Sequence, residues 1–124
     1  MTLAAEKKTI LVVEDDILLL AMLSETLRRR GYNVLPALSA KEALSVFRRS
    51  KEPIDLAVVD FSLPDIDGVE VSIQFLRHNP AFKILGMSGM VTIEDRFQAI
   101  GVEFIRKPFE TDQLVLKIDA YVNS

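Results

Sequence analysis

Four apolar segments of this sequence each end at polar residues that could take part in metal or phosphoryl chemistry. These residues offer carboxylates, a hydroxyl and an ammonium, and they are Glu14 and Asp15, Asp60, Ser88 and Lys107. If the segments are parallel strands of one sheet, their ends lie along the edge where open α/β sheets bind ligands. Carboxylates suit a divalent cation, whereas an ammonium and a hydroxyl suit phosphoryl oxygens. The pattern therefore predicts one crevice for a cation and a phosphoryl group.

The elements that would position these residues alternate five times between strand-like and helix-like patterns. Continuous apolar runs are typical of strands covered on both faces, as in a parallel sheet. The expected strands lie at about 9–13, 33–35, 56–59, 84–87 and 104–106. Helical spacing is clearest in 17–30, where one stripe contains Leu19, Leu20, Leu23 and Leu27. The sequence therefore predicts an α/β fold with a parallel sheet.

Capping and turn residues indicate where the helices should begin and end. Ser39 to Glu42 matches a capping box, and Gly31 can take the left-handed conformation that ends the first helix. Thr92 and Thr111 are expected to cap the fourth and fifth helices, because threonine hydroxyls accept backbone N–H groups at such positions. Asp16 is expected to begin the first helix rather than to join the carboxylates before it.

Composition limits the class of protein. With 124 residues the chain should form one domain, and its 49% hydrophobic content suits a compact core. The net charge of −3 argues against a nucleic-acid surface, and no cysteine is present for disulfides or thiolate chemistry. No apolar run approaches the roughly 20 residues that cross a membrane, and residues 1–8 form a charged leader without the apolar core of a secretory signal. These features favour a cytoplasmic protein.

Four motifs, in this order, carry a resemblance to a known family. They are Val12-Val13-Glu14-Asp15-Asp16, Asp60 followed by Leu63-Pro64-Asp65-Ile66-Asp67-Gly68, Ser88-Gly89, and Lys107-Pro108-Phe109. Over residues 9–124 the chain resembles the receiver domain of two-component response regulators. The resemblance implies a flavodoxin-like, doubly wound α/β fold, in which a five-stranded parallel sheet of order 2-1-3-4-5 is flanked by five helices, as in chemotaxis receivers.

The resemblance assigns the central chemistry to Asp60 as the phosphoacceptor. Its carboxylate would attack a phosphohistidine or a small phosphodonor and form an acyl phosphate. Crowded carboxylates repel one another unless a cation joins them, so the site should bind Mg²⁺. By resemblance, Asp60 and Asp15 ligate the cation directly, Glu14 acts through a water, and the backbone carbonyl of Ser62 completes the protein ligands.

The other site residues implied by the resemblance bind the phosphoryl group or transmit its arrival. Lys107 would pair with the acceptor carboxylate and then with the phosphoryl oxygens, held in place by a cis peptide bond to Pro108. The Ser88 hydroxyl would donate to a phosphoryl oxygen, and Gly89 would leave the approach open. Phe104 occupies the aromatic position of the switch, often tyrosine in the family, and would turn inward without a hydroxyl to anchor it.

The implied function is that of a signalling phosphoacceptor in a two-component phosphorelay. The phosphoryl donor would be a histidine kinase or a histidine phosphotransfer protein. An unknown downstream effector would read the surface of the fourth helix, fifth strand and fifth helix, which could also form a homodimer. The chain would be no enzyme beyond its own phosphorylation and dephosphorylation, and this domain would bind neither nucleic acid nor a membrane.

Three other functions share part of the pattern. A phosphohydrolase of the haloacid-dehalogenase type also uses a nucleophilic aspartate, but Glu14-Asp15-Asp16 does not match the D-x-D pattern of its first strand. A flavodoxin-like electron carrier would share the fold, yet the chain has no Ser/Thr-rich loop after the first strand and no tryptophan. A degenerate receiver that only binds other proteins stays open. So does the choice between a free-standing regulator and part of a longer protein, although no output domain is expected within these residues.

Overall fold

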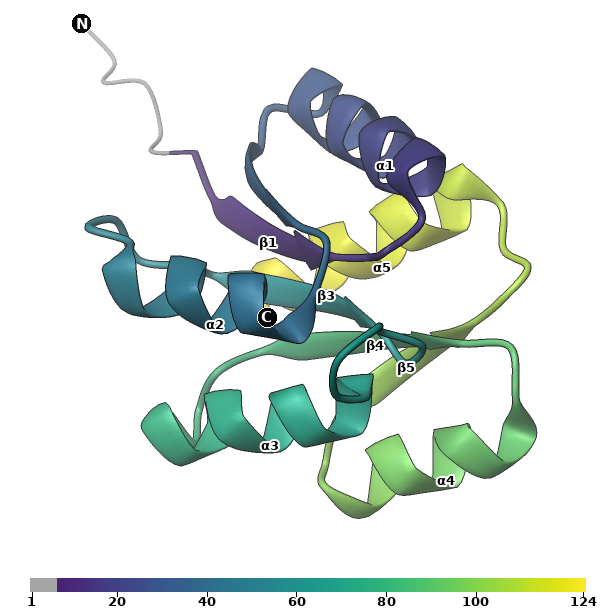
Figure 1. The fold of residues 1–124 in the computed structure, drawn as a ribbon. Helices are drawn as coiled ribbons and strands as arrows, with labels where there is room; N and C mark the ends of the chain where they lie inside the picture. Colours follow the sequence, from purple (N-terminus) through teal and green to yellow (C-terminus); the bar gives the residue numbers. More distant parts are fainter. Residues whose placement is uncertain (1–6) are drawn as a thin grey trace, which may run out of the picture.

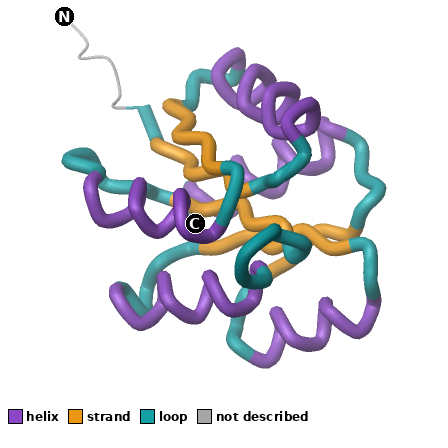
Figure 2. Tube along the Cα trace, viewed as in Figure 1, coloured by secondary structure: helices purple, strands orange, loops and turns teal. Residues whose placement is uncertain are grey.

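The computed structural model describes residues 7–124, so most of the predicted leader at 1–8 lies outside the described residues. In this part of the chain five strands and five helices alternate, as the sequence pattern predicts (Figures 1 and 2). The strands are β1 (Thr9–Val13), β2 (Asn33–Ala37), β3 (Leu56–Asp60), β4 (Ile84–Ser88) and β5 (Glu103–Arg106). The helices are α1 (Ile17–Arg29), α2 (Ala40–Arg49), α3 (Gly68–His78), α4 (Val91–Ala99) and α5 (Thr111–Val122).

The strands form one parallel sheet in the order β2-β1-β3-β4-β5, which confirms the expected doubly wound topology. α1 and α5 cover one face of the sheet, and α2, α3 and α4 cover the other (Figure 1). Because all strands run in the same direction, the loops that follow them emerge along one edge. Across residues 7–124, no helix combines the length and the apolar character that a bilayer crossing requires.

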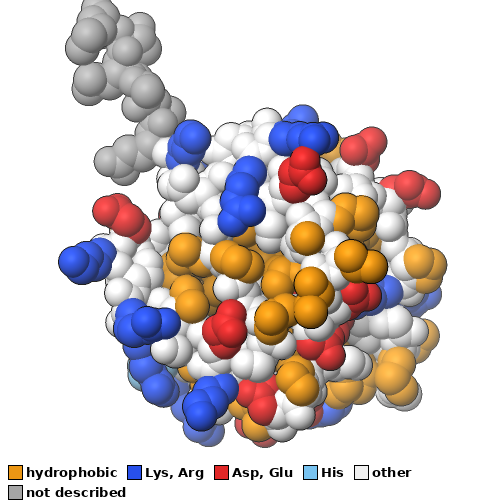
Figure 3. All heavy atoms as spheres, turned by 45° about the horizontal axis from the view of Figure 1, so that its top comes forward, with side chains coloured by type: hydrophobic (Ala, Val, Ile, Leu, Met, Phe, Trp, Pro, Cys, Tyr) orange, Lys and Arg blue, Asp and Glu red, His pale blue; other side chains and the backbone are white. Residues whose placement is uncertain are grey.

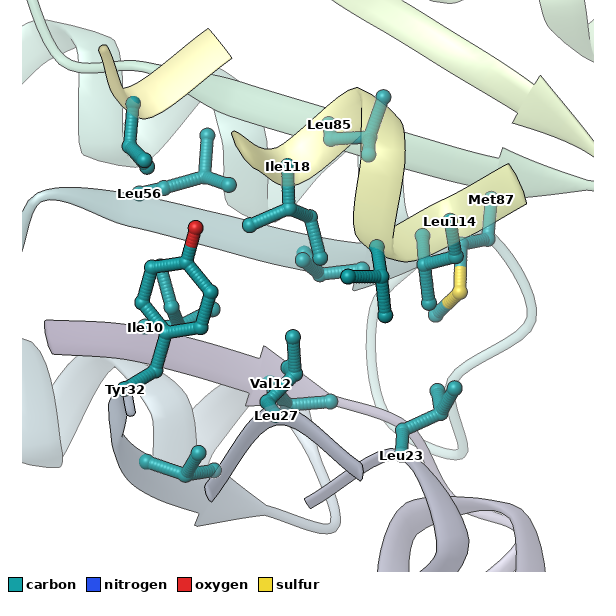
Figure 4. Close-up of a cluster of buried hydrophobic side chains, with 14 of the residues drawn as sticks. Ile10, Val12, Leu23, Leu27, Tyr32, Leu56, Leu85, Met87, Leu114 and Ile118 are labelled. Atoms are coloured by element: carbon teal, nitrogen blue, oxygen red, sulfur yellow. The ribbon is translucent and has the colours of Figure 1, made fainter. Parts of the chain in front are cut away.

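The core explains why the strands are nearly continuous apolar runs. Every residue of β1, β3 and β4 is buried, because helices cover both faces of the sheet. Side chains alternate along β1, so that Ile10 and Val12 pack with α1 and α5 (Figure 4), whereas Leu11 and Val13 pack with the helices on the other face. A slip of one residue would exchange the two sets, so packing fixes the register in which the strand ends meet.

The first two helices begin where their capping residues predict. The Asp16 carboxylate accepts the N–H of Leu18 at 3.0 Å, and the Ser39 hydroxyl accepts the N–H of Glu42 at 3.1 Å. Beyond α1, Gly31 has φ of 93°, the left-handed conformation expected for a residue that ends a helix. Local sequence therefore sets the limits of the helix that follows β1.

The starts of α4 and α5 differ from the prediction, which placed caps at Thr92 and Thr111. The residue before α4 is Met90, whose side chain makes no capping hydrogen bond. The residue before α5 is Glu110, whose N–H donates to the Gln113 side chain at 3.1 Å. Both threonines therefore lie inside the first turn, and the helices begin where neighbouring groups satisfy the preceding backbone.

Candidate functional site

The parallel register brings the predicted site residues to one edge of the sheet. β1 pairs with β3, β3 with β4, and β4 with β5, each in register at its carboxyl end. Glu14 directly follows β1, Asp60 ends β3, Ser88 ends β4, and Lys107 directly follows β5. Segments that lie far apart in the sequence therefore place acidic, hydroxyl and basic groups beside one another.

Lys107 joins two buried carboxylates at this edge. Its Nζ lies 2.7 Å from Oδ1 of Asp60 and 2.9 Å from Oε1 of Glu14. Glu14 and Asp60 are only 1% and 4% exposed, whereas Asp15 is exposed. One carboxylate oxygen from each of the three acids lies within 4.8 Å of the others. Three carboxylates and one ammonium therefore meet in a small volume, which leaves an excess of negative charge.

Burial and pairing determine how the charged groups of this cluster titrate. Burial raises the pKa of Asp60 above its ordinary value, although the hydrogen bond from Lys107 opposes the rise. Burial also raises the pKa of Glu14, against hydrogen bonds from the Asp16 N–H and from Lys107. Burial disfavours the charged form of Lys107, but its hydrogen bonds to the two carboxylates outweigh that effect and raise its pKa. The ammonium is therefore held in its charged form by the acids around it.

Glu14 is more constrained than the sequence suggests. While Oε1 accepts from Lys107, Oε2 accepts the N–H of Asp16 at 3.1 Å, so each oxygen has a partner. Asp16 itself is exposed and caps α1, which confirms that it belongs to the helix and not to the carboxylate cluster. A cation that entered the site would compete with Lys107 for Glu14.

The loop after β3 is held tightly beside Asp60. The Gly68 N–H donates to the Phe61 carbonyl at 2.8 Å, and a Cβ on Gly68 would lie only 2.3 Å from the backbone oxygen of Asp60. The Asp65 carboxylate accepts the first two N–H groups of α2, at 3.0 and 2.7 Å. These bonds outweigh burial and lower the pKa of Asp65. Sequence reasoning missed this cross-link, which joins a carboxylate to a helix N-terminus distant in sequence.

Ser88 is buried and its hydroxyl is engaged at the start of α4. The Oγ atom accepts the N–H of Met90 at 3.0 Å and lies 3.2 Å from the Met90 carbonyl, to which it can donate. Next in the chain, Gly89 is exposed, and a Cβ there would find its nearest neighbours, both in Lys107, at 3.9 Å. The approach to the carboxylate cluster is therefore open at this point.

The remaining predicted residues lie around the same edge. The Lys107–Pro108 peptide bond is cis, as the resemblance predicts. Ser62 is exposed in the loop that follows Asp60. Phe104 is half-buried in β5, beside a surface hollow of about 310 Å³ that Gln98 and Lys117 also line.

Exposed apolar side chains lie on one side of the site, on α1 and in the loop after β5. Figure 3 shows hydrophobic groups gathered on one face of the molecule. Three exposed apolar side chains come from the first two turns of α1, namely Ile17, Leu18 and Met22. A hollow of about 350 Å³ lies between α1 and the loop after β5, lined by Leu19, Met22, Lys107, Pro108 and Phe109. Contiguous exposed apolar groups of this kind are typical of surfaces that contact other proteins.

Comparison with known proteins identifies the family to which this strand order and these site residues belong. Residues 10–119 match the family model of the response regulator receiver domain. TcrX of Mycobacterium tuberculosis, named a probable transcriptional regulatory protein, is 32% identical over 115 residues, which are 90% of this chain and 48% of TcrX. The alkaline phosphatase synthesis transcriptional regulatory protein PhoP of Bacillus subtilis is 33% identical over 120 residues, which are 91% of this chain and 48% of PhoP.

A solved structure shows that the likeness extends to the whole fold. The CheY-like receiver domain protein of Methanospirillum hungatei is 28% identical, with a TM-score of 0.87 over 95% of each chain. This chain spans about half the length of the curated relatives it matches. None of these comparisons favours a phosphohydrolase or an electron carrier. By its sequence, its strand order and the residues at its sheet edge, the chain belongs to the family of receiver domains of two-component response regulators.

Proposed function

We propose that residues 9–124 act as a phosphoacceptor domain and that Asp60 receives the phosphoryl group. The observation that carries this proposal is the buried Asp60 carboxylate, 2.7 Å from the Lys107 ammonium at the carboxyl edge of the sheet. An aspartate in this position is accessible past Gly89 and has a cation ready to pair with incoming oxygens. The presence of the carboxylate cluster together with Lys107 favours this function over that of a degenerate receiver that only binds proteins.

In the proposed transfer, an Asp60 carboxylate oxygen attacks phosphorus in line with the bond that breaks. From a phosphohistidine, the P–N bond breaks and its electron pair stays on the imidazole nitrogen, while a new O–P bond makes an acyl phosphate. Lys107 moves from the carboxylate to the transferred oxygens and stabilises their charge. The Ser88 hydroxyl supplies a further donor once it leaves Met90.

The acidic cluster fits a divalent cation, for which Mg²⁺ is the proposed choice. The close approach of oxygens from Glu14, Asp15 and Asp60 provides the hard, negative donor set that Mg²⁺ prefers. Asp15 and Asp60 would be direct ligands, Glu14 would act through a water, and the Ser62 carbonyl would complete the set. When bound, the cation would neutralise charge on the phosphoryl oxygens.

The proposed partners follow from the family and from the exposed apolar side chains of α1 and the loop after β5. A histidine kinase or a histidine phosphotransfer protein would present its phosphohistidine at the open mouth beside α1, where exposed apolar groups can be covered. The signal would leave through α4, β5 and α5 as Phe104 turns inward, toward an effector or a second copy of the chain. This domain would work in the cytoplasm, bind no nucleic acid itself, and catalyse only its own phosphorylation and dephosphorylation.

Labelling with a small phosphodonor tests the central proposal. With acetyl phosphate and Mg²⁺, intact-protein mass spectrometry should show the addition of one phosphoryl group, which EDTA should prevent. Asp60→Asn should abolish the addition. Asp16→Asn is the matched control, since it changes a neighbouring exposed carboxylate that caps α1 and should leave labelling unchanged. Equal labelling of Asp60→Asn and the parent protein would refute the assignment.

A further inference from the structure

α4 is held by two buried apolar side chains, Ile93 and Phe97, and by a few polar contacts around its first turn. Its inner face places Phe97, which is fully buried, against β4, where a Cβ on Gly86 would lie 2.8 Å from the Phe97 ring. The helix is only nine residues long. Met90, the residue just before it, makes no capping hydrogen bond with its side chain, and its own N–H donates to the Ser88 hydroxyl. The position of its first turn therefore depends on contacts with neighbouring strands.

One of these contacts is an ion pair between α4 and β5, made by Glu94 and Arg106. The guanidinium donates two hydrogen bonds to the carboxylate, from Nε to Oε2 at 2.7 Å and from Nη2 to Oε1 at 2.8 Å. The Glu94 side chain is 8% exposed and that of Arg106 is 61% exposed. Among the described residues, Arg106 is the sole ion-pair partner of Glu94. This contact, the α4–β5 ion pair, therefore covers the Glu94 carboxylate and supplies its charged partner.

The α4–β5 ion pair spans the turn that contains Ser88. Arg106 lies beside Ser88 in the β4–β5 ladder, and the next residue, Lys107, donates its N–H to the Ser88 carbonyl at 2.8 Å. Glu94 lies in the first turn of α4, where its N–H donates to the Met90 carbonyl at 3.3 Å. When the Ser88 hydroxyl leaves Met90, the first turn of α4 loses that hydrogen bond but keeps the α4–β5 ion pair.

We propose that Glu94 and Arg106 are positioning residues that hold α4 in its resting place and set how strongly the phosphoryl group must act to move it. The inference rests on the function proposed above, in which Ser88 turns from Met90 to the phosphoryl oxygens. Movement of the first turn away from β5 separates the bidentate pair and leaves the Glu94 carboxylate without its partner. The pair therefore favours the resting state, and the phosphoryl group must offset its loss.

A second ion pair holds α4 from a different side, so the two ion pairs restrain the helix in different directions. On α4, Arg96 lies 3.3 Å from Asp67 and 5.4 Å from the centroid of the Phe61 ring, in the loop after Asp60. Residues two positions apart on a helix point to nearly opposite sides, about 200° around the axis. The Arg96 contacts therefore join α4 to the loop after β3, residues 61–67, here called the phosphoacceptor loop, whereas Glu94 joins α4 to β5. Loss of the α4–β5 ion pair would leave the Arg96–Asp67 ion pair, on the side of Asp60, as the remaining ion pair of the helix among the described residues.

Beryllofluoride with Mg²⁺ serves as the probe, because it mimics a phosphoryl group on an aspartate. We would measure its dissociation constant by NMR titration for the parent protein, Glu94→Gln, Arg106→Gln and the double variant. Each single variant should bind the probe about threefold more tightly or better, because less free energy is needed to move α4. The double variant should bind no more tightly than the tighter single variant, since both substitutions remove one contact.

A control and a second readout separate positioning from general destabilisation. Glu25→Gln removes an exposed ion pair with Arg29 on α1 and should leave the dissociation constant unchanged. Thermal unfolding without the probe should show a lower Tm for Arg106→Gln, yet binding should be tighter, which a merely structural role does not explain. Unchanged or weaker binding by both single variants would overturn the inference, even if the parent protein binds the probe through Asp60. No binding by the parent protein would overturn the proposed function as well.

Discussion

The two halves of the sheet edge are held in different ways. On the β1–β3 side, Asp60 and Glu14 are buried and share Lys107, and backbone passes so close to Asp60 that Gly68 has no space for a side chain. On the β4–β5 side, α4 is held by the buried side chains of Ile93 and Phe97, by the Ser88 hydroxyl, and by ion pairs with exposed arginines. The first half is fixed by backbone packing and buried charge, and the second by a few separable side-chain contacts.

The difference matches two requirements that one small domain must meet. Phosphoryl transfer needs acidic and basic groups that keep their positions while charge moves between them. A change of surface needs an element whose displacement costs little free energy. The two requirements are met on adjacent strands, so Ser88 at the boundary can belong to both.

The largest effect that tests this comparison is expected from Gly68→Ala. A Cβ at this position would lie 2.3 Å from backbone oxygen, and no rotamer change can relieve that clash. The free energy of unfolding should fall by about 3 kcal/mol or more, and labelling of Asp60 should be lost as the loop moves. Urea denaturation and mass spectrometry would measure the two effects.

Gly89→Ala is the matched control for this substitution, on the same edge of the sheet. Its Cβ would have no neighbour closer than 3.9 Å, so its free energy of unfolding should stay within about 0.5 kcal/mol of the parent value. If both alanine variants were equally stable, the loop after β3 would not be fixed by close packing, and the comparison would fail.

A smaller effect is expected from Gly86→Ala, which introduces a clash on the α4 side. The new Cβ would lie 2.8 Å from the ring of Phe97, a side chain that can shift together with its helix. We expect a loss of about 1–2 kcal/mol and faster amide exchange in α4, with Asp60 still labelled. Loss of labelling, or destabilisation equal to that of Gly68→Ala, would show that α4 is no more mobile than the phosphoacceptor loop.

The contrast between the two halves also explains what the sequence could predict. Asp60, Ser88 and Lys107 each follow an apolar strand, and strand ends of a parallel sheet must share one edge, so their convergence follows from the pattern. The 2-1-3-4-5 strand order came from the family resemblance, because alternation of strands and helices fits several orders. The strand order is confirmed, and Lys107 lies 2.7 Å from Asp60 at the edge of the sheet where Ser88 ends β4.

The α4 half was harder to predict because its contacts depend on tertiary structure. Thr92 has the side chain of a helix cap, but the Ser88 hydroxyl satisfies the Met90 N–H and the helix begins before Thr92. Glu94 and Arg106 have no distinctive spacing, and an acidic residue on a helix is ordinarily a solvated one. Their pairing becomes visible only when α4 lies against β5.

Removal of the cation should affect the carboxylate half alone. Mg²⁺ at about ten times its Kd should stabilise the parent protein by about 1.4 kcal/mol, because it binds the folded acidic cluster and not the unfolded chain. Asp15→Asn should reduce this gain, since Asp15 is the exposed member of the cluster, and Arg106→Gln should keep it. Thermal unfolding with Mg²⁺ or EDTA would measure both. An equal response of Asp15→Asn and the parent protein would exclude Asp15 as a ligand.

The smallest effect is expected from Phe104→Tyr, which adds one hydroxyl on the β4–β5 side. The ring is half-buried beside an open hollow with polar neighbours, so the hydroxyl can stay hydrated and the free energy of unfolding should change by less than about 0.5 kcal/mol. In the switched state, a hydroxyl could gain a hydrogen bond that phenylalanine cannot make, and such a gain in one state shifts the population toward it. NMR spectra with beryllofluoride and Mg²⁺ should therefore show larger shifts in α4 and β5 for the tyrosine variant, with unchanged shifts around Asp60. Equal shifts in α4 for both proteins would mean that the ring transmits the signal by its shape alone, and that the attachments of α4, rather than residue 104, set how far the signal travels.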